Sequence, residues 1–276
     1  MSLDSRLTLV RDGRASVALE GLVPAAAYVE PTTRRLTAPS AAIRREPRAA
    51  SEQMDQLLFG ELFDVLEEAD GWAFGQARRD GYVGFVEAVE LGEPAATTHW
   101  VSALRTYAFS EPNIKSAPVG LYSINALVAV EAREGRFAKG ADTGWFIEDH
   151  LTAIGVGETD HAAVAERFLG APYQWGGRES LGLDCSGLVQ QALYASAKAC
   201  PRDSDQQAEL GSPVDAAALE RGDLVFWKGH VAIVTGDNAI IHANAHHMMV
   251  ARETLDQAIE RIRTAGAGEP TAYRRP

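Results

Sequence analysis

The chain has 276 residues, of which 46% are hydrophobic and 23% charged, so it can bury a core without disulfide support. Its formal net charge of −12, with no basic stripe, repels phosphate backbones, and we exclude nucleic-acid binding. No run approaches the ~20 apolar residues of a membrane helix, and the N-terminal residues lack the apolar segment of a signal peptide. We therefore expect a cytoplasmic protein that does not enter a membrane.

The first fifty residues mix arginines with prolines and contain few apolar runs. Segments of this composition are typical of extended or irregular chain. We interpret residues 1–50 as an extended lead-in with little core of its own. The arginines and prolines of this segment are Arg34, Arg35, Arg44, Arg45, Arg48, Pro31, Pro39 and Pro47.

From residue 51 the chain shows short apolar runs at roughly ten-residue spacing. Asp70-Gly71 and Asp80-Gly81 separate these runs, and Asp-Gly pairs are typical of hairpin turns. This pattern predicts a small β-barrel over residues 51–93. A weaker copy of the pattern, with a Glu134–Gly135 turn, predicts a second barrel over residues 94–156.

Residues 157–276 have a different pattern, in which helices come before strands. A short helix from His161 is followed by a glycine- and aromatic-rich loop, and a second helix begins at Cys185. Three strands then follow, at 223–227, 230–235 and 239–243. Helices followed by antiparallel strands predict an α+β domain. The predicted fold is thus two small β-barrels followed by an α+β domain.

Cys185 is the candidate nucleophile. Asp184 and Ser186 are both suitable N-cap residues, so Cys185 lies at or just inside a helix start, where the helix dipole favours the thiolate. A buried structural cysteine is the alternative, but the polar neighbours favour the nucleophile. Cys200, next to Pro201, has no such context, and we interpret it as structural.

A cysteine nucleophile needs an imidazole base and a third group that orients the imidazole. A three-residue loop at 236–238 would set Ala232 opposite His242. His230 then shares a face with His242 as its diagonal neighbour, ~7–8 Å away. A two-residue loop would put the two rings on opposite faces. Either histidine alone would be an ordinary strand residue, but together with Cys185 they predict a base and its orienting group.

A metal site is the competing use of cysteine and histidine. The sequence contains no Cys-x-x-Cys and no His-Glu-x-x-His spacing, so we expect neither a metal nor another cofactor. His246 and His247 are expected on a solvated turn.

Several motifs, in this order along residues 160–276, resemble the NlpC-type cell-wall peptidases, which are papain-like cysteine peptidases. The resemblance implies the triad Cys185, His230 and His242. It also implies that Tyr173 helps to form the oxyanion site and that Trp175 lies in the substrate-facing loop, although loop packing would also explain both aromatic residues. The motifs are 172–177 (Pro-Tyr-Gln-Trp-Gly-Gly), 184–189 (Asp-Cys-Ser-Gly-Leu-Val), 221–226 (Arg-Gly-Asp-Leu-Val-Phe), 229–233 (Gly-His-Val-Ala-Ile) and 241–243 (Ile-His-Ala).

The two barrels resemble bacterial SH3-like domains, and the combination is similar to the γ-D-glutamyl-L-diamino-acid endopeptidases. The resemblance implies a murein peptide with a free N-terminal L-Ala as substrate. Asp184, Ser186 and Ser204 would bind its N-terminal dipeptide. Glu61 and Tyr82 of the first barrel would close the site to longer chains, although Glu61 could equally be a solvated strand residue.

Two other functions remain open from the sequence. The barrels could belong to a wall-binding protein whose peptidase domain is inactive. The papain-like domain could instead be an amidase or acyltransferase, since those enzymes use similar cysteine and histidine residues. The sequence does not decide between lysine and meso-diaminopimelate as the diamino acid, and it indicates no oligomeric state.

Overall fold

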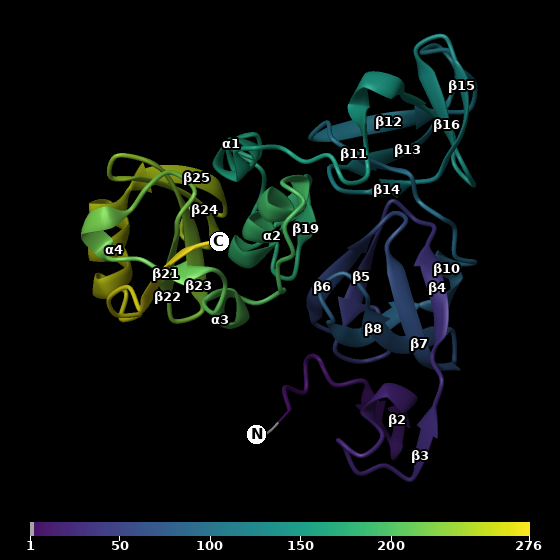
Figure 1. Ribbon diagram of the computed structural model, residues 1–276, viewed down its shortest axis with the longest axis horizontal. Helices are drawn as coiled ribbons and strands as arrows, with labels where there is room; N and C mark the ends of the chain where they lie inside the picture. Colours follow the sequence, from purple (N-terminus) through teal and green to yellow (C-terminus); the bar gives the residue numbers. More distant parts are fainter. Residues whose placement is uncertain (1–2) are drawn as a thin grey trace. The chain divides into compact units, whose positions relative to one another are not determined.

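The computed structural model describes residues 3–276 and divides into two compact units, one up to Ile154 and one from Gly155 to Pro276 (Figure 1). Among the described residues, no helix is both long and apolar enough to span a membrane. All α-helices described belong to the second unit, whereas the first is built from strands. Short 3₁₀ helices occupy Val17–Leu19, Ala88–Glu90, Glu148–His150 and Ala216–Ala218.

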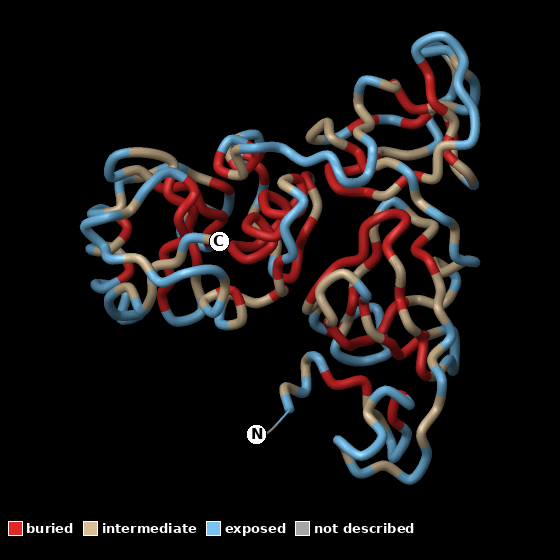
Figure 2. Tube along the Cα trace, in the orientation of Figure 1, coloured by how far each residue is buried: buried red, intermediate tan, exposed pale blue. Residues whose placement is uncertain are grey.

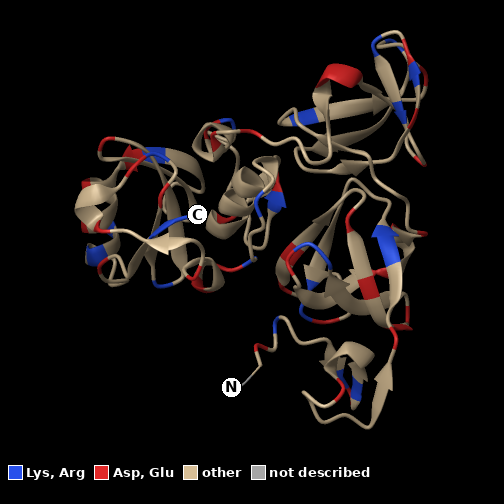
Figure 3. Ribbon diagram, viewed as in Figure 1, with Lys and Arg blue, Asp and Glu red and all other residues tan. Residues whose placement is uncertain are grey.

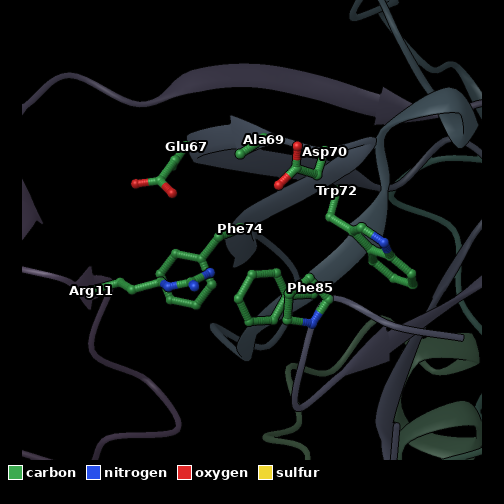
Figure 4. A pocket seen from close by; sticks show the side chains of 8 residues that line it. Arg11, Glu67, Ala69, Asp70, Trp72, Phe74 and Phe85 are labelled. Carbon is green, nitrogen blue, oxygen red and sulfur yellow. The ribbon is translucent and has the colours of Figure 1, made fainter. Parts of the chain in front are cut away.

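The first unit begins with a small three-stranded sheet that packs on a β-barrel. Leu9 joins Phe74 and Phe85 in one apolar cluster. The Arg11 guanidinium lies 4.4 Å from the Phe85 ring centroid and 5.5 Å from that of Phe74, and these residues line a pocket together with Glu67 (Figure 4). These contacts fix the N-terminal segment to the barrel. The strands are β1 (Val10–Arg11), β2 (Arg14–Ser16) and β3 (Ala27–Val29).

The first barrel is a seven-stranded sheet in the order β10-β4-β7-β8-β9-β5-β6. Its core includes Leu36, Ile43, Leu57 and Phe63, which are fully buried. The strands are β4 (Thr32–Leu36), β5 (Ser40–Arg44), β6 (Gln53–Leu58), β7 (Leu62–Ala69), β8 (Trp72–Ala77), β9 (Val83–Glu87) and β10 (Leu91–Gly92).

This barrel starts before residue 51, which corrects the prediction that residues 1–50 form a lead-in. Strand β4 pairs with β7 and β10, and β5 pairs with β6 and β9. Arg35, which suggested irregular chain, is only 2% exposed. Its guanidinium lies over the Phe59 ring and donates to Asp142 Oδ2 at 2.6 Å. An arginine with a buried stem and a paired head is compatible with a strand.

The second barrel contains two sheets, β14-β11-β18 and β13-β12-β17-β16-β15. Phe59, from the β6–β7 turn of the first barrel, packs inside the second barrel's core. A Cβ on Gly60 would lie 2.1 Å from the Leu127 carbonyl oxygen, so only glycine allows this approach. The strands are β11 (His99–Val101), β12 (Arg105–Phe109), β13 (Pro118–Ser123), β14 (Leu127–Val128), β15 (Val130–Glu134), β16 (Phe137–Gly140), β17 (Trp145–Ile147) and β18 (Leu151–Ala153).

The second unit packs helix α2 (Cys185–Ala195) against a six-stranded sheet in the order β21-β26-β22-β23-β24-β25. Every residue of α2 is buried and none is charged (Figures 2 and 3). The sheet contains β21 (Ser212–Pro213), β22 (Leu224–Trp227), β23 (His230–Gly236), β24 (Ala239–Asn244), β25 (Met249–Thr254) and β26 (Ala272–Arg275). The remaining elements are α1 (His161–Glu166), β19 (Arg178–Glu179), β20 (Gly182–Leu183), α3 (Ser204–Gln207) and α4 (Leu255–Thr264).

The observed order of elements confirms the predicted fold class of two SH3-like barrels followed by an α+β domain.

The amphipathic helix α4 covers one face of the sheet. Its Ala258 and Ile262 pack with Val225, Ala232 and Ile240. Side chains alternate between the two faces of a strand, so the side chains of His230 and His242 leave the backbone on the same face of the sheet as those of Ala232 and Ile240.

Candidate active site

Cys185 is the first residue of α2, as its polar N-terminal neighbour predicts. Asp184 is the N-cap, and its Oδ1 accepts from the Gly187 backbone N–H at 2.8 Å. A Cβ on residue 187 would lie 2.2 Å from the Gly177 carbonyl oxygen. The glycine-rich loop at 176–177 therefore passes directly against the first turn of this helix.

Cys185 is 8% exposed, and its thiol lies beside the start of strand β23. Burial and the charge of Asp184 raise its pKa to about 12, although the backbone N–H groups of Val231 and Ser186 favour the thiolate. Burial thus outweighs the helix-start effect, and the resting residue is a thiol. A base must remove the proton as the sulfur attacks.

Strand β23 begins at His230, one residue before the Val231 N–H that faces the sulfur. Burial and the neighbouring His242 lower the pKa of His230 to about 3. A neutral imidazole can accept a proton, so His230 is in the protonation state that a general base requires.

The hairpin between β23 and β24 brings the two histidines together. Its loop is two residues, Asp237 and Asn238, rather than three, but a β-bulge between Val234 and Gly236 restores the register. Ile233 pairs with Ile241, and continuing that register sets Ala232 opposite His242. His230 Nε2 and His242 Nδ1 are 2.8 Å apart.

A carboxylate continues this chain of polar groups. His242 is fully buried, and its Nε2 lies 2.8 Å from Glu253 Oε1 on the neighbouring strand β25. Desolvation of Glu253 opposes ionisation, but the contacts with His242 and Arg261 lower the pKa of this carboxyl to about 2. The Arg261 guanidinium of α4 forms an ion pair with Glu253.

The ionised Glu253 decides which ring nitrogens carry protons. A carboxylate oxygen 2.8 Å away repels a ring lone pair, so the proton of the neutral His242 ring lies on Nε2. His242 Nδ1 is then an acceptor, and it receives the Nε2–H of His230. The remaining nitrogen of His230, Nδ1, keeps its lone pair free for the proton of the nucleophile.

Glu253 and Arg261 are functional candidates that sequence reasoning missed. Neither lies in a motif of the resemblance, and Arg261 precedes Ile262 in what reads as an ordinary amphipathic helix. The alternation along β25 offers one signal, because it places Glu253 and Ala251 on the same face of the strand, and Ala251 pairs with His242.

The predicted dipeptide-binding residues surround a buried ion pair. Asp184 accepts from both terminal nitrogens of Arg202, at 3.0 and 2.5 Å, and from the Gly176 N–H at 2.9 Å. Ser186 donates to Asp184 and accepts from Arg202 at 2.7 Å. An incoming ammonium group would have to share Asp184 with the fully buried Arg202. Ser204 begins α3, half-buried, two residues after Arg202.

The loop before α2 brings Tyr173 to the nucleophile. Burial and the charges of Cys185 and Asp184 raise the pKa of Tyr173, so its hydroxyl stays protonated and can donate a hydrogen bond. Trp175, in the same loop, is 62% exposed, and its part in substrate binding stays a prediction.

Glu61 and Tyr82 both belong to the first barrel. Glu61 is 1% exposed and accepts from Arg79 at 2.7 Å, and Arg79 also donates to the Asn125 carbonyl of the second barrel. The alternative of a solvated strand residue is therefore wrong for Glu61. Tyr82 is 5% exposed. That these two residues close the substrate site stays a prediction.

Three potential metal ligands cluster at the back of the histidine pair. The donor atoms of His242, His247 and Glu253 lie within 4.8 Å of one another. The guanidinium of Arg261, paired with Glu253, opposes a second cation there.

Cys200 is buried beside Pro201, and its carbonyl accepts from the Tyr194 hydroxyl at 2.8 Å, which fits a structural residue.

The family match covers this site. Residues 170–267 match the NlpC/P60 family, and residues 43–91 match the bacterial dipeptidyl-peptidase SH3 domain. The C-terminal domain belongs to the NlpC/P60 family. The NlpC/P60 match includes Cys185, His230, His242 and Glu253, and the SH3 match includes Glu61. The protein is a cysteine peptidase with SH3-like domains before its NlpC/P60 domain.

Named relatives match this chain over most of its length. The Bacillus subtilis γ-D-glutamyl-L-lysine dipeptidyl-peptidase is 27% identical over 74% of this chain and 76% of its own length. Dipeptidyl-peptidase 6 of Lysinibacillus sphaericus is 25% identical over 77% of this chain and 88% of its own. The crystal structure of an NlpC/P60 family protein from Bacillus cereus has the same fold, with a TM-score of 0.76, 20% identity, and coverage of 88% of this chain and 99% of that one.

Proposed function

We propose that this NlpC/P60 protein hydrolyses the amide between the γ-carboxyl of D-Glu and a diamino acid, in murein peptides that have a free N-terminal L-Ala. The observation that carries the proposal is the polar chain His230–His242–Glu253, which begins one residue from the backbone N–H that faces the Cys185 sulfur. Relatives over three quarters of the chain are named dipeptidyl-peptidases, one of them for the γ-D-glutamyl-L-lysine bond. Such an enzyme serves the turnover or recycling of cell-wall peptides.

The first half of the reaction acylates the enzyme. His230 Nδ1 takes the thiol proton as the Cys185 sulfur attacks the γ-carbonyl carbon. The carbonyl oxygen becomes an oxyanion, which the backbone N–H groups at the start of α2 and the Tyr173 hydroxyl can stabilise. The resulting imidazolium of His230 is stabilised through His242 by the negative charge of Glu253.

The second half releases both products. The imidazolium of His230 gives its proton to the leaving amine, the C–N bond breaks, and a thioester with Cys185 remains. His230 then takes a proton from water, which attacks the thioester; the C–S bond breaks, L-Ala-γ-D-Glu leaves, and His230 returns the proton to the Cys185 sulfur. Ser186, Ser204 and a shared Asp184 would bind the N-terminal dipeptide, with Trp175 in the adjoining loop.

The test is turnover of L-Ala-γ-D-Glu-diaminopimelate, followed by mass spectrometry of the products. The wild-type protein should release L-Ala-γ-D-Glu, and acetylation of the N-terminal amine of L-Ala should prevent this release. Cys185→Ala should abolish turnover and leave folding intact, and His242→Ala should leave reduced activity. Cys200→Ala is the matched control, which should keep the wild-type rate.

Three outcomes would overturn the proposal. Full hydrolysis by Cys185→Ala would exclude the mechanism. Binding to purified sacculi without any turnover would instead support a wall-binding protein, and transfer of the acyl group to an added amine in preference to water would support an acyltransferase.

A further inference from the structure

A second pocket lies beside the proposed base, in the NlpC/P60 domain. It has a volume of about 200 Å³ and is lined by the β22–β23 turn, the end of β24 and the C-terminal end of α4. His230 is part of its wall. No residue of α2 lines it, so it is distinct from the place where the acyl group meets the nucleophile.

The chemistry of the proposed reaction places the leaving group here. The leaving amine receives its proton from His230, so it must lie within hydrogen-bond reach of that ring when the C–N bond breaks. The amino acid attached to this amine then extends into space that His230 borders. This pocket is such a space, and the inference below rests on the proposed function.

The walls of the pocket fit an aliphatic chain. They are mostly apolar, and the pocket is open to solvent at one side, as a chain with a polar end requires. The apolar lining residues are Trp227, Ala245, Ile262, Ala265 and Ala267.

The charges around the pocket are of one sign. Lys228 and Arg261 line it together with His246, and none of the lining residues described is acidic. The charge of Arg261 is balanced by its ion pair with Glu253. Lys228 is exposed and has no ion-pair partner among residues 3–276, so its charge is unbalanced.

The end of α4 adds little negative charge to this balance. Carbonyl groups at a helix C-terminus carry a partial negative charge that would favour a cation. Here the Arg261, Ile262 and Arg263 carbonyls accept from the backbone N–H groups of residues 265–267. The full charge of Lys228 therefore outweighs the helix end.

We infer that this pocket binds the diamino acid of the substrate and that Lys228 favours meso-diaminopimelate over lysine. The far end of a diaminopimelate side chain has a carboxylate beside its amine, which can pair with Lys228. The far end of a lysine side chain has only an ammonium group, which Lys228 repels. Lys228 is thus a specificity-determining residue of the leaving-group site.

The experiment compares two substrates that differ only in this residue, L-Ala-γ-D-Glu-meso-diaminopimelate and L-Ala-γ-D-Glu-L-Lys. Wild-type protein should have the higher kcat/KM for the diaminopimelate substrate. Lys228→Gln should lower the ratio of the two kcat/KM values by about 2- to 5-fold, the size of one exposed ion pair, and Lys228→Glu should lower it further. Lys115→Glu, at an exposed lysine of the first unit, makes the same charge change and should leave the ratio unaltered.

A third substrate separates failure of this inference from failure of the proposed function. L-Ala-γ-D-Glu-p-nitroanilide has a leaving group with neither a carboxylate nor an ammonium group. If wild-type protein cleaves none of the three, the proposed function is wrong. If it cleaves them but Lys228→Glu leaves the ratio unchanged, or wild type prefers lysine, the inference about the pocket is wrong and the proposed function stands.

Discussion

Each of the two units of the protein contains a buried carboxylate paired with an arginine, and the two pairs are built differently. In the NlpC/P60 domain, Asp184 receives two guanidinium nitrogens of the fully buried Arg202. In the barrels, Glu61 accepts from Arg79, whose side chain is 19% exposed.

The two pairs support different parts of the molecule. The Asp184–Arg202 pair fixes the loop at Gly176 and the cap of the nucleophile helix, because Asp184 accepts three further hydrogen bonds. The Glu61–Arg79 pair joins the two barrels, since Arg79 also donates to the Asn125 carbonyl. In each pair the loss of one partner lowers the free energy of unfolding, because a buried charge is left without its counterion. Water can replace Arg79 more readily than Arg202.

Loss of the deeper pair should have the largest effect. Arg202→Met leaves the buried Asp184 carboxylate without its counterion and should lower the free energy of unfolding of the NlpC/P60 domain by about 3–5 kcal/mol. Urea denaturation monitored by circular dichroism measures this. Peptidase activity should fall with it, because the same carboxylate caps the helix that begins at Cys185.

Loss of the shallower pair should cost less. Arg79→Met should lower the free energy of unfolding of the barrel unit by about 1.5–3 kcal/mol, the range for hydrogen bonds to a charged group. Arg133→Met, which breaks an exposed pair with Glu148, is the control and should change stability by ~0–1 kcal/mol. An Arg79→Met loss as large as that of Arg202→Met would contradict the comparison.

Acid should destabilise the NlpC/P60 domain through its buried histidines. In the folded protein the pKa of His230 is lowered to about 3. Below pH ~6.5 this histidine therefore binds a proton in the unfolded chain but not in the folded protein, so the free energy of unfolding falls as the pH falls through this window. The slope for one such group reaches ~1.4 kcal/mol per pH unit. Glu253, with its pKa lowered to about 2, adds a loss in the same direction below ~4.3. Thermal unfolding of wild type and His230→Gln between pH 4 and 7 measures the slope, which the variant should reduce.

The smallest effect is expected at the far end of the polar chain. Glu253→Gln removes the negative charge that stabilises the imidazolium but leaves an oxygen that can accept from His242. We expect kcat to fall by roughly tenfold, which corresponds to ~1.4 kcal/mol, with KM nearly unchanged. Glu253→Leu should cost more, and in a His242→Ala background neither change should matter further. Independent, additive losses would show that Glu253 does not act through His242.

The sequence predicts the parts of this protein that depend on short motifs and alternation. The capped start of α2 follows from local rules. The opposition of Ala232 and His242 is expected from a three-residue loop, but it arises from a two-residue loop and a bulge at Thr235. The bulge could not be predicted, because one extra residue in a strand has no distinct composition. Strand β4 escaped prediction because Arg35 is polar yet buried. Arg202 and Glu253 contribute through contacts with distant residues, which no local pattern reports.

The bulged hairpin between β23 and β24 constrains how this segment can change over evolution. The parity of its residue count decides which side of the sheet each histidine occupies. Removing one residue would leave a strand pair of similar composition with one imidazole turned away from the other. Insertions or deletions of two residues would preserve the arrangement, so functional descendants of this hairpin should differ in length by even numbers.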